Sequence, residues 1–455
     1  MKLQKIHLTS LGCAKNLVDS ERLLASTITS LQLQPVAEAE EADLVVINTC
    51  AFLQSAVEEA LGQIMELGGR KKSGAKLMVI GCLPARYRRQ EGREMAQGLP
   101  EVDLWLPPED YHRFEEAAAR LLKRPAPAQA SFSPDGLPQR GRLSGHRVSA
   151  TPFFRSFLKI SEGCDNRCTY CLIPRLRGPL KSYPQERLIS EAEELADSGA
   201  RELTLVAQDI TAYGLDLGSD AQALPKLVRK LSDIRKLDWI RILYAYPERL
   251  NEALIKDLAA IPKVLPYLDL PFQHASAEIL KRMGRRRVNS PAELVKKLRL
   301  WWPGLALRTT LIVGFPGESE QHFEELSNFV REAAFDHLGV FKFSPEPEAP
   351  ASRLPDPTPQ IVKEKRRRRI MAEQKKIALA HNKARVGRSF SVLVEGPSED
   401  SPMVMVGRAP FQAPEVDGLI YFDGEQPEAG EIVETRIIKA APYDLIGIVE
   451  TDLPD

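Results

Sequence analysis

The stretch Cys164-Asp165-Asn166-Arg167-Cys168-Thr169-Tyr170-Cys171 spaces three cysteines at intervals of four and three positions, with no fourth cysteine or histidine close behind. Thiolates are soft ligands that suit iron–sulfur clusters, zinc or copper. A structural zinc site takes four protein ligands, usually as two close pairs. Three thiols on one loop suit a cubane cluster better, because they hold three irons and leave one open to a small molecule. The alternative is a zinc knuckle whose fourth ligand lies far away in the chain.

The residues around this loop indicate a parallel α/β fold. From residue 151 to about 345 a strand-then-helix pattern repeats six times, and the cysteine loop follows the first strand after a turn at Gly163. Parallel folds of this kind place reactive groups at the carboxyl ends of their strands. Six units predict a partial (βα)6 barrel with a lateral opening for a large substrate. The expected strands are Phe157–Ile160, Glu202–Val206, Trp239–Tyr244, Leu265–Leu270, Ala306–Val313 and Leu338–Phe343.

Polar residues and turns along and after these strands are candidates for binding a cofactor, since strand-end loops tend to carry function. We choose Gln208, Gln273, Thr310, Gly314 and Glu318. For each, the alternative is a solvated loop residue or a helix cap. Glu318 would also place a negative charge at the start of the following helix.

Three further cysteines follow strand-like runs in the first 120 residues. The runs are Lys5–Thr9, Asp43–Ile47 and Lys76–Ile80, and the cysteines are Cys13, Cys50 and Cys82. Strands that alternate with helices predict a doubly wound parallel sheet. Because parallel strands end at one edge of the sheet, the three thiols should converge there. One such cysteine alone is more often an inert buried residue, but three together predict a second cluster site.

Composition narrows the class of protein. The 455 residues carry 62 basic and 62 acidic side chains, so no global field attracts nucleic acid or a membrane. No apolar run approaches the roughly 20 residues of a membrane span. The first residues lack the apolar core of a signal peptide. Six cysteines without an export signal indicate metal chemistry in the cytoplasm rather than disulfides.

The chain divides into four expected parts. Residues 1–120 form the amino-terminal cluster domain, 121–150 a linker rich in proline and glycine, 151–384 the (βα)6 core and 385–455 a small β-barrel of the OB kind. The core ends in a helix that begins with the basic run Lys363–Arg369. That run favours either nucleic-acid binding or, at least as readily, a solvated face or contacts with neighbouring acidic surface.

Charge in the small barrel favours a basic protein as partner. From residue 387 to 455 there are 4 basic and 14 acidic residues, a balance of 4 − 14 = −10. A nucleic-acid barrel needs a positive groove along the phosphates. This one would repel them, so a nucleic acid is not expected as the direct substrate.

Taken together, these motifs resemble the methylthiotransferase family of radical S-adenosylmethionine (SAM) enzymes over the whole chain, most closely its RimO type, which modifies a ribosomal-protein aspartate. Ser10–Glu21 is similar to the family's opening motif, Asn48–Phe52 and Gly81-Cys82 to the next two, and Ile160–Gly178 to the radical SAM signature. Ala413–Gly418 resembles the RimO form of the TRAM domain. Ala14, Ala51 and the basic Arg285-Arg286-Arg287 depart from the pattern, and none is expected to touch a ligand.

The resemblance implies a mechanism. Cys164, Cys168 and Cys171 would hold a 4Fe-4S cluster whose free iron binds SAM, and reductive cleavage of SAM would yield a radical that removes hydrogen from an unactivated carbon. Cys13, Cys50 and Cys82 would hold a second 4Fe-4S cluster that presents sulfur, which a second SAM methylates. The implied acceptor is the β-carbon of an aspartate in small-subunit ribosomal protein twelve, and the implied electron donor is a low-potential carrier such as flavodoxin or ferredoxin.

Two rival functions share these residues. The tRNA-modifying branch of the same family adds methylthio to an adenosine and uses the same cysteines; the acidic barrel and Pro414–Gly418 argue against it. A non-enzymatic iron–sulfur electron carrier or redox sensor is the rival of another class, although carriers usually bind all their irons through protein ligands.

Overall fold

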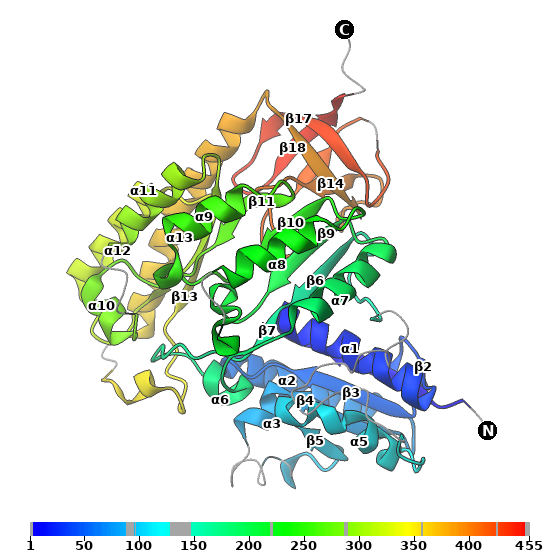
Figure 1. Cartoon of the computed structure of the whole chain (residues 1–455). Helices are drawn as coiled ribbons and strands as arrows, with labels where there is room; N and C mark the ends of the chain where they lie inside the picture. Colours follow the sequence, from blue (N-terminus) through cyan, green and yellow to red (C-terminus); the bar gives the residue numbers. More distant parts are fainter. Residues whose placement is uncertain are drawn as a thin grey trace.

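The computed structural model describes residues 3–87, 95, 97–127, 147–218, 222–285, 290–355, 358–424 and 426–450. Three parts follow one another in Figure 1: an α/β domain in blue and cyan, an open barrel in green to yellow, and a small β-barrel in red. Most of the predicted linker, together with Arg286 and Arg287, lies outside the described residues. In the described part of the chain, no helix combines the length and the apolar character that crossing a membrane requires.

The amino-terminal domain is a parallel sheet in the order β2-β1-β3-β4-β5, with helices on both faces. Its central strand β3 is buried at all six positions, as expected for a strand covered on both sides. The predicted doubly wound sheet is confirmed, and the two short outer strands β2 and β5 were not predicted. The elements are β1 (Lys5–Ser10), α1 (Ala14–Leu31), β2 (Gln34–Pro35), β3 (Leu44–Thr49), α2 (Gln54–Arg70), β4 (Lys76–Gly81), α3 (Cys82–Arg86), β5 (Leu104–Leu106) and α5 (Phe114–Leu121).

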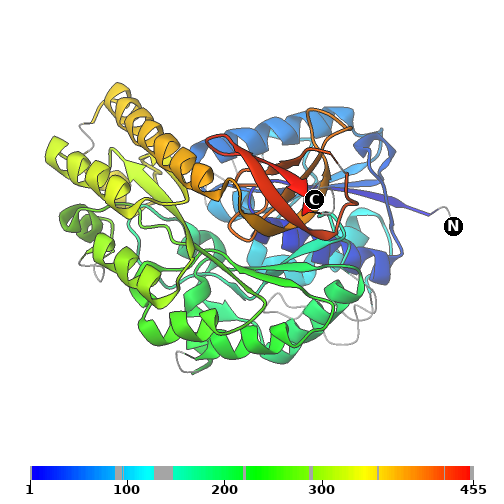
Figure 2. The same ribbon diagram turned by 90° about the horizontal axis from the view of Figure 1, so that it is seen from above.

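The open barrel contains the six predicted strands in sequential order, all parallel, with its two outer strands unpaired to each other. The predicted partial (βα)6 barrel is confirmed. Its strands are β6 (Arg155–Lys159), β9 (Glu202–Val206), β10 (Trp239–Ile242), β11 (Val264–Asp269), β12 (Ala306–Val313) and β13 (His337–Lys342). Its outer helices are α7 (Gln185–Asp197), α8 (Ala223–Ser232), α9 (Glu252–Ala259), α10 (Ala277–Arg282), α11 (Pro291–Trp301) and α12 (Glu320–Ala333). Figure 2 shows these helices around the outside of the curved sheet.

A short antiparallel pair follows β6 and carries the cysteine loop. The strands β7 (Ser161–Glu162) and β8 (Lys181–Ser182) pair with each other, and helix α6 (Ile173–Arg177) lies in the loop between them. The chain therefore leaves and re-enters the barrel edge at one place. This closed loop fixes where the three cysteines project.

Helix α13 (Gln360–Arg385) packs on β13 and α12 and carries the basic run. Lys363 is fully buried, and its ammonium donates to the Phe343 carbonyl. Arg366 pairs with Glu318 at 2.7 Å, and Arg369 pairs with Glu324. Arg366 and Arg369 of the basic run therefore contact acidic residues of the chain itself, as the second alternative for this run predicted.

The small barrel closes in the order β14-β15-β16-β18-β17, which confirms the predicted small β-barrel. Its strands are β14 (Ser389–Pro397), β15 (Met405–Arg408), β16 (Ile420–Phe422), β17 (Ile432–Ala440) and β18 (Leu445–Val449). Its apolar core is continuous with residues of the open barrel and of α1, including Phe157, Tyr267 and Val18. The three parts of the chain thus share one buried cluster.

Part of the small barrel's acidic charge binds the open barrel. Glu395 pairs with Arg155 at 3.2 Å, and Asp417 lies 3.4 Å from Arg308. In the reverse sense, Arg408 of the small barrel reaches Glu202 of β9, which is fully buried and also accepts from Arg241 at 2.6 Å. Some acidic residues of the small barrel therefore bind it to the open barrel instead of adding to the charge of its outer surface. The net charge alone did not predict this role.

Candidate functional site

The loop thiols, Cys164, Cys168 and Cys171, owe their position to a tight closure of the loop. Gly163 has φ +73°, and a Cβ atom there would lie 2.0 Å from the Pro179 carbonyl oxygen. Only glycine fits such a contact and such a backbone angle. The Cys164 amide then donates to the Gly178 carbonyl at 3.1 Å, so both ends of the loop meet just before the first thiol.

A polar triad holds the middle of the loop against the barrel. Asn166 donates to Asp209 at 2.7 Å, Arg249 donates to Asp209 at 3.0 Å, and Arg249 also donates to Asn166 at 2.8 Å. Asp209 follows β9 and Arg249 precedes α9, so two barrel units fix the residue between the first two cysteines. Arg249 carried no signal in the sequence, because its partners are 40 and 83 positions away.

The loop thiols line an open cavity of about 700 Å³ together with residues of α6 and the segment around Glu348. Burial raises the pKa of Cys164 to about 11 and that of Cys171 to about 12. The Ile173 amide lies 3.4 Å from the Cys171 sulfur, and the Tyr246 hydroxyl lies 3.7 Å from the Cys168 sulfur. Hydrogen-bond donors around cysteine sulfurs are a feature by which proteins tune iron–sulfur clusters.

Arg285 contributes to this site, although the sequence gave reason only to note it as a departure. Its guanidinium lies 4.1 Å from the centroid of the Tyr246 ring and donates to the Tyr170 hydroxyl at 3.3 Å. Glu248, at 3.3 Å, balances its charge. Arg285 bonds no thiol directly, yet it fixes two tyrosines next to the loop thiols.

The amino-terminal thiols, Cys13, Cys50 and Cys82, follow the adjacent strands β1, β3 and β4. Cys13 precedes the first residue of α1, and Cys82 is the first residue of α3. A Cβ atom at Gly12, whose φ is +91°, would lie 3.2 Å from the Cys50 sulfur. The strand ends thus bring the three thiols together at one edge of the sheet, as the parallel topology predicted.

Cations surround the amino-terminal thiols. Burial raises the pKa of Cys50 to about 11, and burial also raises the pKa of Cys82 against the opposing charge of Arg177. Burial acts in the same direction on Cys13, but Lys15 and Arg177 outweigh it and lower the pKa of that thiol. A thiolate at Cys13 is therefore the best stabilised of these three.

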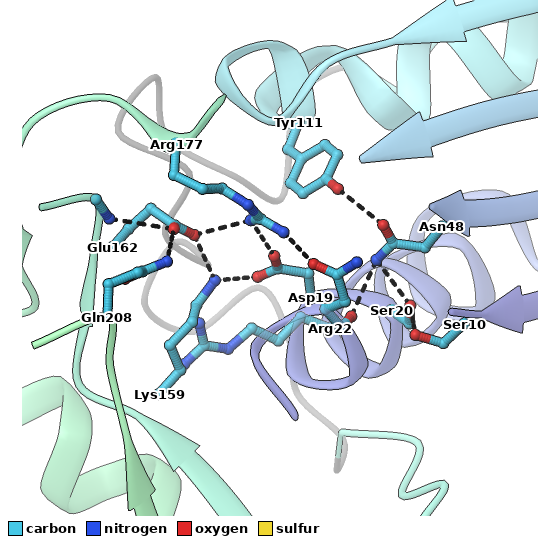
Figure 3. A network of polar contacts seen from close by, with 12 residues as sticks. Ser10, Asp19, Ser20, Arg22, Asn48, Tyr111, Lys159, Glu162, Arg177 and Gln208 are labelled. Atoms are coloured by element: carbon cyan, nitrogen blue, oxygen red, sulfur yellow. Dashed lines mark hydrogen bonds and ion pairs between the residues drawn. The ribbon is translucent and has the colours of Figure 1, made fainter. Parts of the chain in front are cut away.

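Arg177 lies between the two cysteine motifs, and Figure 3 shows its bonds to Asp19 and Glu162. Its Nε donates to the Cys82 sulfur at 3.3 Å, and its Nη1 donates to Asp19 at 2.8 Å and to Glu162 at 3.1 Å. The guanidinium crosses from α6 of the open barrel to α1 and α3 of the amino-terminal domain. Its carboxylate Glu162 lies two residues before Cys164, so one buried cation contacts both cluster motifs.

Glu162 and Asp19 extend this junction. Lys159 bonds to both carboxylates, at 2.9 Å for Glu162, and Gln208 donates to Glu162 at 2.7 Å. The pKa of Glu162 falls to about 2, because the attraction of Lys159 and Arg177 exceeds the opposing effect of burial. The Glu162 carboxylate is thus ionised, and it accepts hydrogen bonds from Lys159, Arg177 and Gln208. Arg177, Lys159 and Asp19 had no functional role assigned from the sequence. Arg177 and Asp19 lie within the two cysteine motifs, and Lys159 lies in the predicted strand Phe157–Ile160.

The structure places the five proposed cofactor-binding residues in different roles. Gln208 bonds to Glu162, and Gln273, with φ 71°, bridges to β12 through its backbone. Gly314 donates to Glu318, whose carboxylate is buried and paired with Arg366. Thr310 lies half-buried within β12. Among the described residues that line the cavity at the loop thiols, none of these five occurs. Their contact with SAM stays a prediction.

The spacing of the side chains bears on the zinc alternative. Within the described ranges, no three His, Cys, Asp or Glu side chains gather closely enough to hold a single metal ion. Sulfurs around one tetrahedral zinc lie about 4 Å apart, because each Zn–S bond is about 2.3 Å long. Cubane ligands lie farther apart, since each binds a different iron. The zinc alternative and the cubane cluster thus differ in the spacing of sulfurs that each requires.

Comparison with known proteins bears on the whole chain. Three family models match: uncharacterized protein family UPF0004 over residues 5–107, the radical SAM superfamily over 158–330 and the TRAM domain over 386–449. A curated relative from Pelobacter propionicus, ribosomal protein uS12 methylthiotransferase RimO, is 42% identical over 98% of this chain and 98% of its own. The protein of the same name from Geobacter sulfurreducens is also 42% identical over 98% of each chain.

The chain belongs to the RimO family of radical SAM methylthiotransferases. Membership of the radical SAM superfamily implies a 4Fe-4S cluster and SAM as cofactors. It also favours an enzyme over the electron carrier. A solved structure of TsrM, a radical SAM methyltransferase from Kitasatospora setae, matches with a TM-score of 0.52 at 14% identity over 74% of this chain and 72% of that chain. At this identity the likeness concerns the fold alone.

Proposed function

We propose that this protein adds a methylthio group to the β-carbon of an aspartate in ribosomal protein uS12. The observation that carries the proposal is the near full-length similarity to proteins named uS12 methylthiotransferase, supported by Arg177, which bonds to Cys82 of one cysteine set and to Glu162, two residues before Cys164 of the other. A reaction that needs both a carbon radical and a sulfur donor requires two such centres within reach of one substrate.

The loop thiols Cys164, Cys168 and Cys171 would hold the 4Fe-4S cluster of the radical SAM superfamily, and Cys13, Cys50 and Cys82 would hold a second. Their thiol donors, with N–H groups directed at the Cys171 and Cys82 sulfurs, suit such clusters. When bound, the first cluster and SAM supply a radical able to remove hydrogen from an unactivated carbon, and the second supplies sulfur. Each set contributes three ligands, so each leaves one iron open.

The chain's own residues orient and enclose these centres. The Asn166, Asp209 and Arg249 triad holds the cysteine loop against the barrel. Arg177 bonds to Glu162, just before that loop, and to Cys82 of the amino-terminal thiols. An apolar cluster shared by α1, the open barrel and the small barrel packs these three parts together.

Acidic residues on the outer face of the small barrel support a basic protein as substrate. After those that dock to the open barrel are set aside, seven exposed acids remain among the described residues: Glu399, Asp400, Asp423, Glu428, Glu431, Glu434 and Glu450. Such a surface attracts a positively charged protein and repels phosphate backbones. We therefore do not propose a nucleic acid as the direct substrate. A low-potential carrier such as flavodoxin or ferredoxin as electron donor, a cytoplasmic location and the four domain boundaries belong to the same proposal.

The test uses the full-length protein with its clusters reconstituted under anaerobic conditions. It is incubated with SAM and a reductant, separately with uS12 and with tRNA, and each product is weighed by mass spectrometry. A gain of one methylthio group on an aspartate of uS12 is expected. A gain on tRNA alone would overturn the proposal in favour of the tRNA-modifying branch.

A further inference from the structure

Lys15 is a buried cation at the junction of the amino-terminal domain and the open barrel. It lies in the first turn of α1, two residues after Cys13, and is only 8% exposed. Its ammonium is 3.5 Å from the centroid of the Tyr244 ring. Tyr244 follows β10, and two residues later the Tyr246 hydroxyl lies 3.7 Å from the Cys168 sulfur. Lys15 therefore reaches from the amino-terminal thiols to the strand end that borders the loop thiols.

The other cations at this junction have carboxylate partners. The pairs are Arg177 with Asp19, Lys159 with Glu162, Arg249 with Asp209 and Arg285 with Glu248. Lys15 differs from them, because no carboxylate of the described residues pairs with its ammonium, and the Tyr244 ring is its nearest partner. The charge of Lys15 acts to lower the pKa of Asp269, at the end of β11, although burial outweighs it. The ion-pair partner of Asp269 is Arg308, at 3.5 Å.

A buried ammonium without a carboxylate is costly. Isolated charges are rarely buried unless paired, and an aromatic face contributes only about 2 kcal/mol even when desolvated. Contact with the ring occupies one side of the ammonium and leaves N–H donors for another group. The other cations at the junction thus have carboxylate partners, whereas Lys15 faces the Tyr244 ring and the Cys13 thiol and has no carboxylate.

The backbone that presents the ring is itself strained. Tyr244 has φ 63°, a left-handed conformation that an aromatic residue rarely adopts. Such strain costs about 1–3 kcal/mol and persists mainly where function requires it. Here it aims the ring at Lys15, so two unfavourable features, a strained tyrosine and an unpaired cation, meet at one point.

We propose that the Lys15 ammonium binds the side-chain carboxylate of the substrate aspartate, an inference that rests on the proposed function. The β-carbon that receives sulfur must lie within reach of both thiol sets, and the carboxylate is bonded directly to that carbon. An aspartate at this place supplies the anion that Lys15 lacks. Lys15 would then select aspartate over its neutral isostere, asparagine.

The competing explanation is that Lys15 only balances the negative charge of the amino-terminal thiolates. Both explanations predict that loss of the charge harms the enzyme. They differ in one respect: only carboxylate binding makes Lys15 the source of discrimination between aspartate and asparagine. The ratio of two affinities, measured on one preparation, separates them, because partial loss of clusters affects both affinities equally.

The experiment uses the full chain with both clusters and SAM bound. Mass spectrometry first identifies the uS12 aspartate that the unaltered enzyme modifies, and a second uS12 is made with asparagine there. Dissociation constants for both forms are measured by fluorescence anisotropy under anaerobic conditions. The variants are Lys15→Met, Lys15→Arg and, as a matched control on the exposed surface of α9, Lys256→Met.

The unaltered enzyme and Lys256→Met should bind the aspartate form about 10- to 100-fold more tightly, the usual range for a hydrogen bond to a charged group. Lys15→Met should bring the ratio to about 1, and Lys15→Arg should retain most of it. An unchanged ratio in Lys15→Met, or equal affinities in the unaltered enzyme, would overturn the assignment. No methylthio gain on uS12 with the unaltered enzyme would instead refute the proposed function itself.

Discussion

Two buried ionic junctions join the open barrel to its neighbours, and they serve different ends. At the amino-terminal junction, Arg177 bonds to Asp19, Glu162 and the sulfur of Cys82. At the carboxyl-terminal junction, Glu202 binds Arg241 and Arg408 and no thiol lies in the network. The same physical device, a desolvated guanidinium between carboxylates, thus builds a candidate reaction site in one place and docks a domain in the other.

The comparison teaches that the burial of charge alone does not mark a functional site. Glu162 and Glu202 both have a pKa of about 2, in each case because attraction to two cations exceeds the opposing effect of burial. What distinguishes the amino-terminal junction is its neighbours: thiols, a strained tyrosine and a cation without a carboxylate. Four predictions test whether the difference holds.

The largest effect is expected when a cysteine is removed from either the loop thiols or the amino-terminal thiols. Cys168→Ala should abolish SAM cleavage, because it removes a ligand of the cluster that binds SAM. Cys50→Ala should leave SAM cleavage in place and stop methylthio transfer. The measurements are 5′-deoxyadenosine release and the mass of uS12, with iron content near eight per unaltered chain and about four per variant. Equal loss of SAM cleavage in both variants would contradict the division of labour.

The next effect is expected at Arg177. Arg177→Gln leaves Asp19 and Glu162 with an unbalanced buried charge and should lower the free energy of unfolding by about 3–5 kcal/mol. It should also shift the reduction potential of the second cluster that we propose at the amino-terminal thiols, since it removes an N–H donor from the Cys82 sulfur. Calorimetry and potentiometric EPR measure the two effects. The control is Arg175→Gln, an exposed residue on the same helix; a shift of equal size there would refute a specific role of Arg177.

At the carboxyl-terminal junction, Arg408→Gln should loosen the small barrel without loss of SAM cleavage. Glu202 keeps Arg241 and Glu395 keeps Arg155, so each carboxylate retains a cation of its own, whereas Asp19 and Glu162 would share Lys159. A smaller destabilisation, about 2–3 kcal/mol, is therefore expected than for Arg177→Gln. Hydrogen exchange over residues 388–450 should rise, while 5′-deoxyadenosine release per cluster should stay at the unaltered level. Loss of SAM cleavage in this variant would show that both junctions support the chemistry and would remove the contrast.

The smallest effect concerns pH at the same junction. The pKa of Glu202 lies at about 2 in the folded protein against an ordinary value of 4.5, since the attraction of Arg408 and Arg241 outweighs burial. A depressed pKa contributes stability above the unfolded value, and this contribution is lost as pH falls from about 4.5 towards 2. The difference in unfolding free energy between the unaltered protein and Glu202→Gln should therefore be constant from pH 8 to 5 and shrink below about 4.5. A difference that changes between pH 8 and 6 would contradict it.

Local patterns in the sequence were sufficient for most of the fold. All six open-barrel strands lie within two residues of their predicted bounds at each end, as for Glu202–Val206, because alternating buried strands and helices leave a strong periodic signal. The short outer strands β2 and β5 were missed, since two or three residues carry too little pattern. The site was predicted where ligands sit close in the chain, as at Cys164, Cys168 and Cys171.

What the sequence alone determined about this protein is its chemistry: three thiols on one loop, three more that follow parallel strands, and the family to which they belong. Only the tertiary structure decided that Arg177 bonds to Cys82, 95 positions away, and that Lys15 lies against Tyr244. The reason is physical. A cysteine motif is set by local spacing, whereas the partner of a buried charge is chosen by how whole domains pack, and no short stretch of sequence contains that choice.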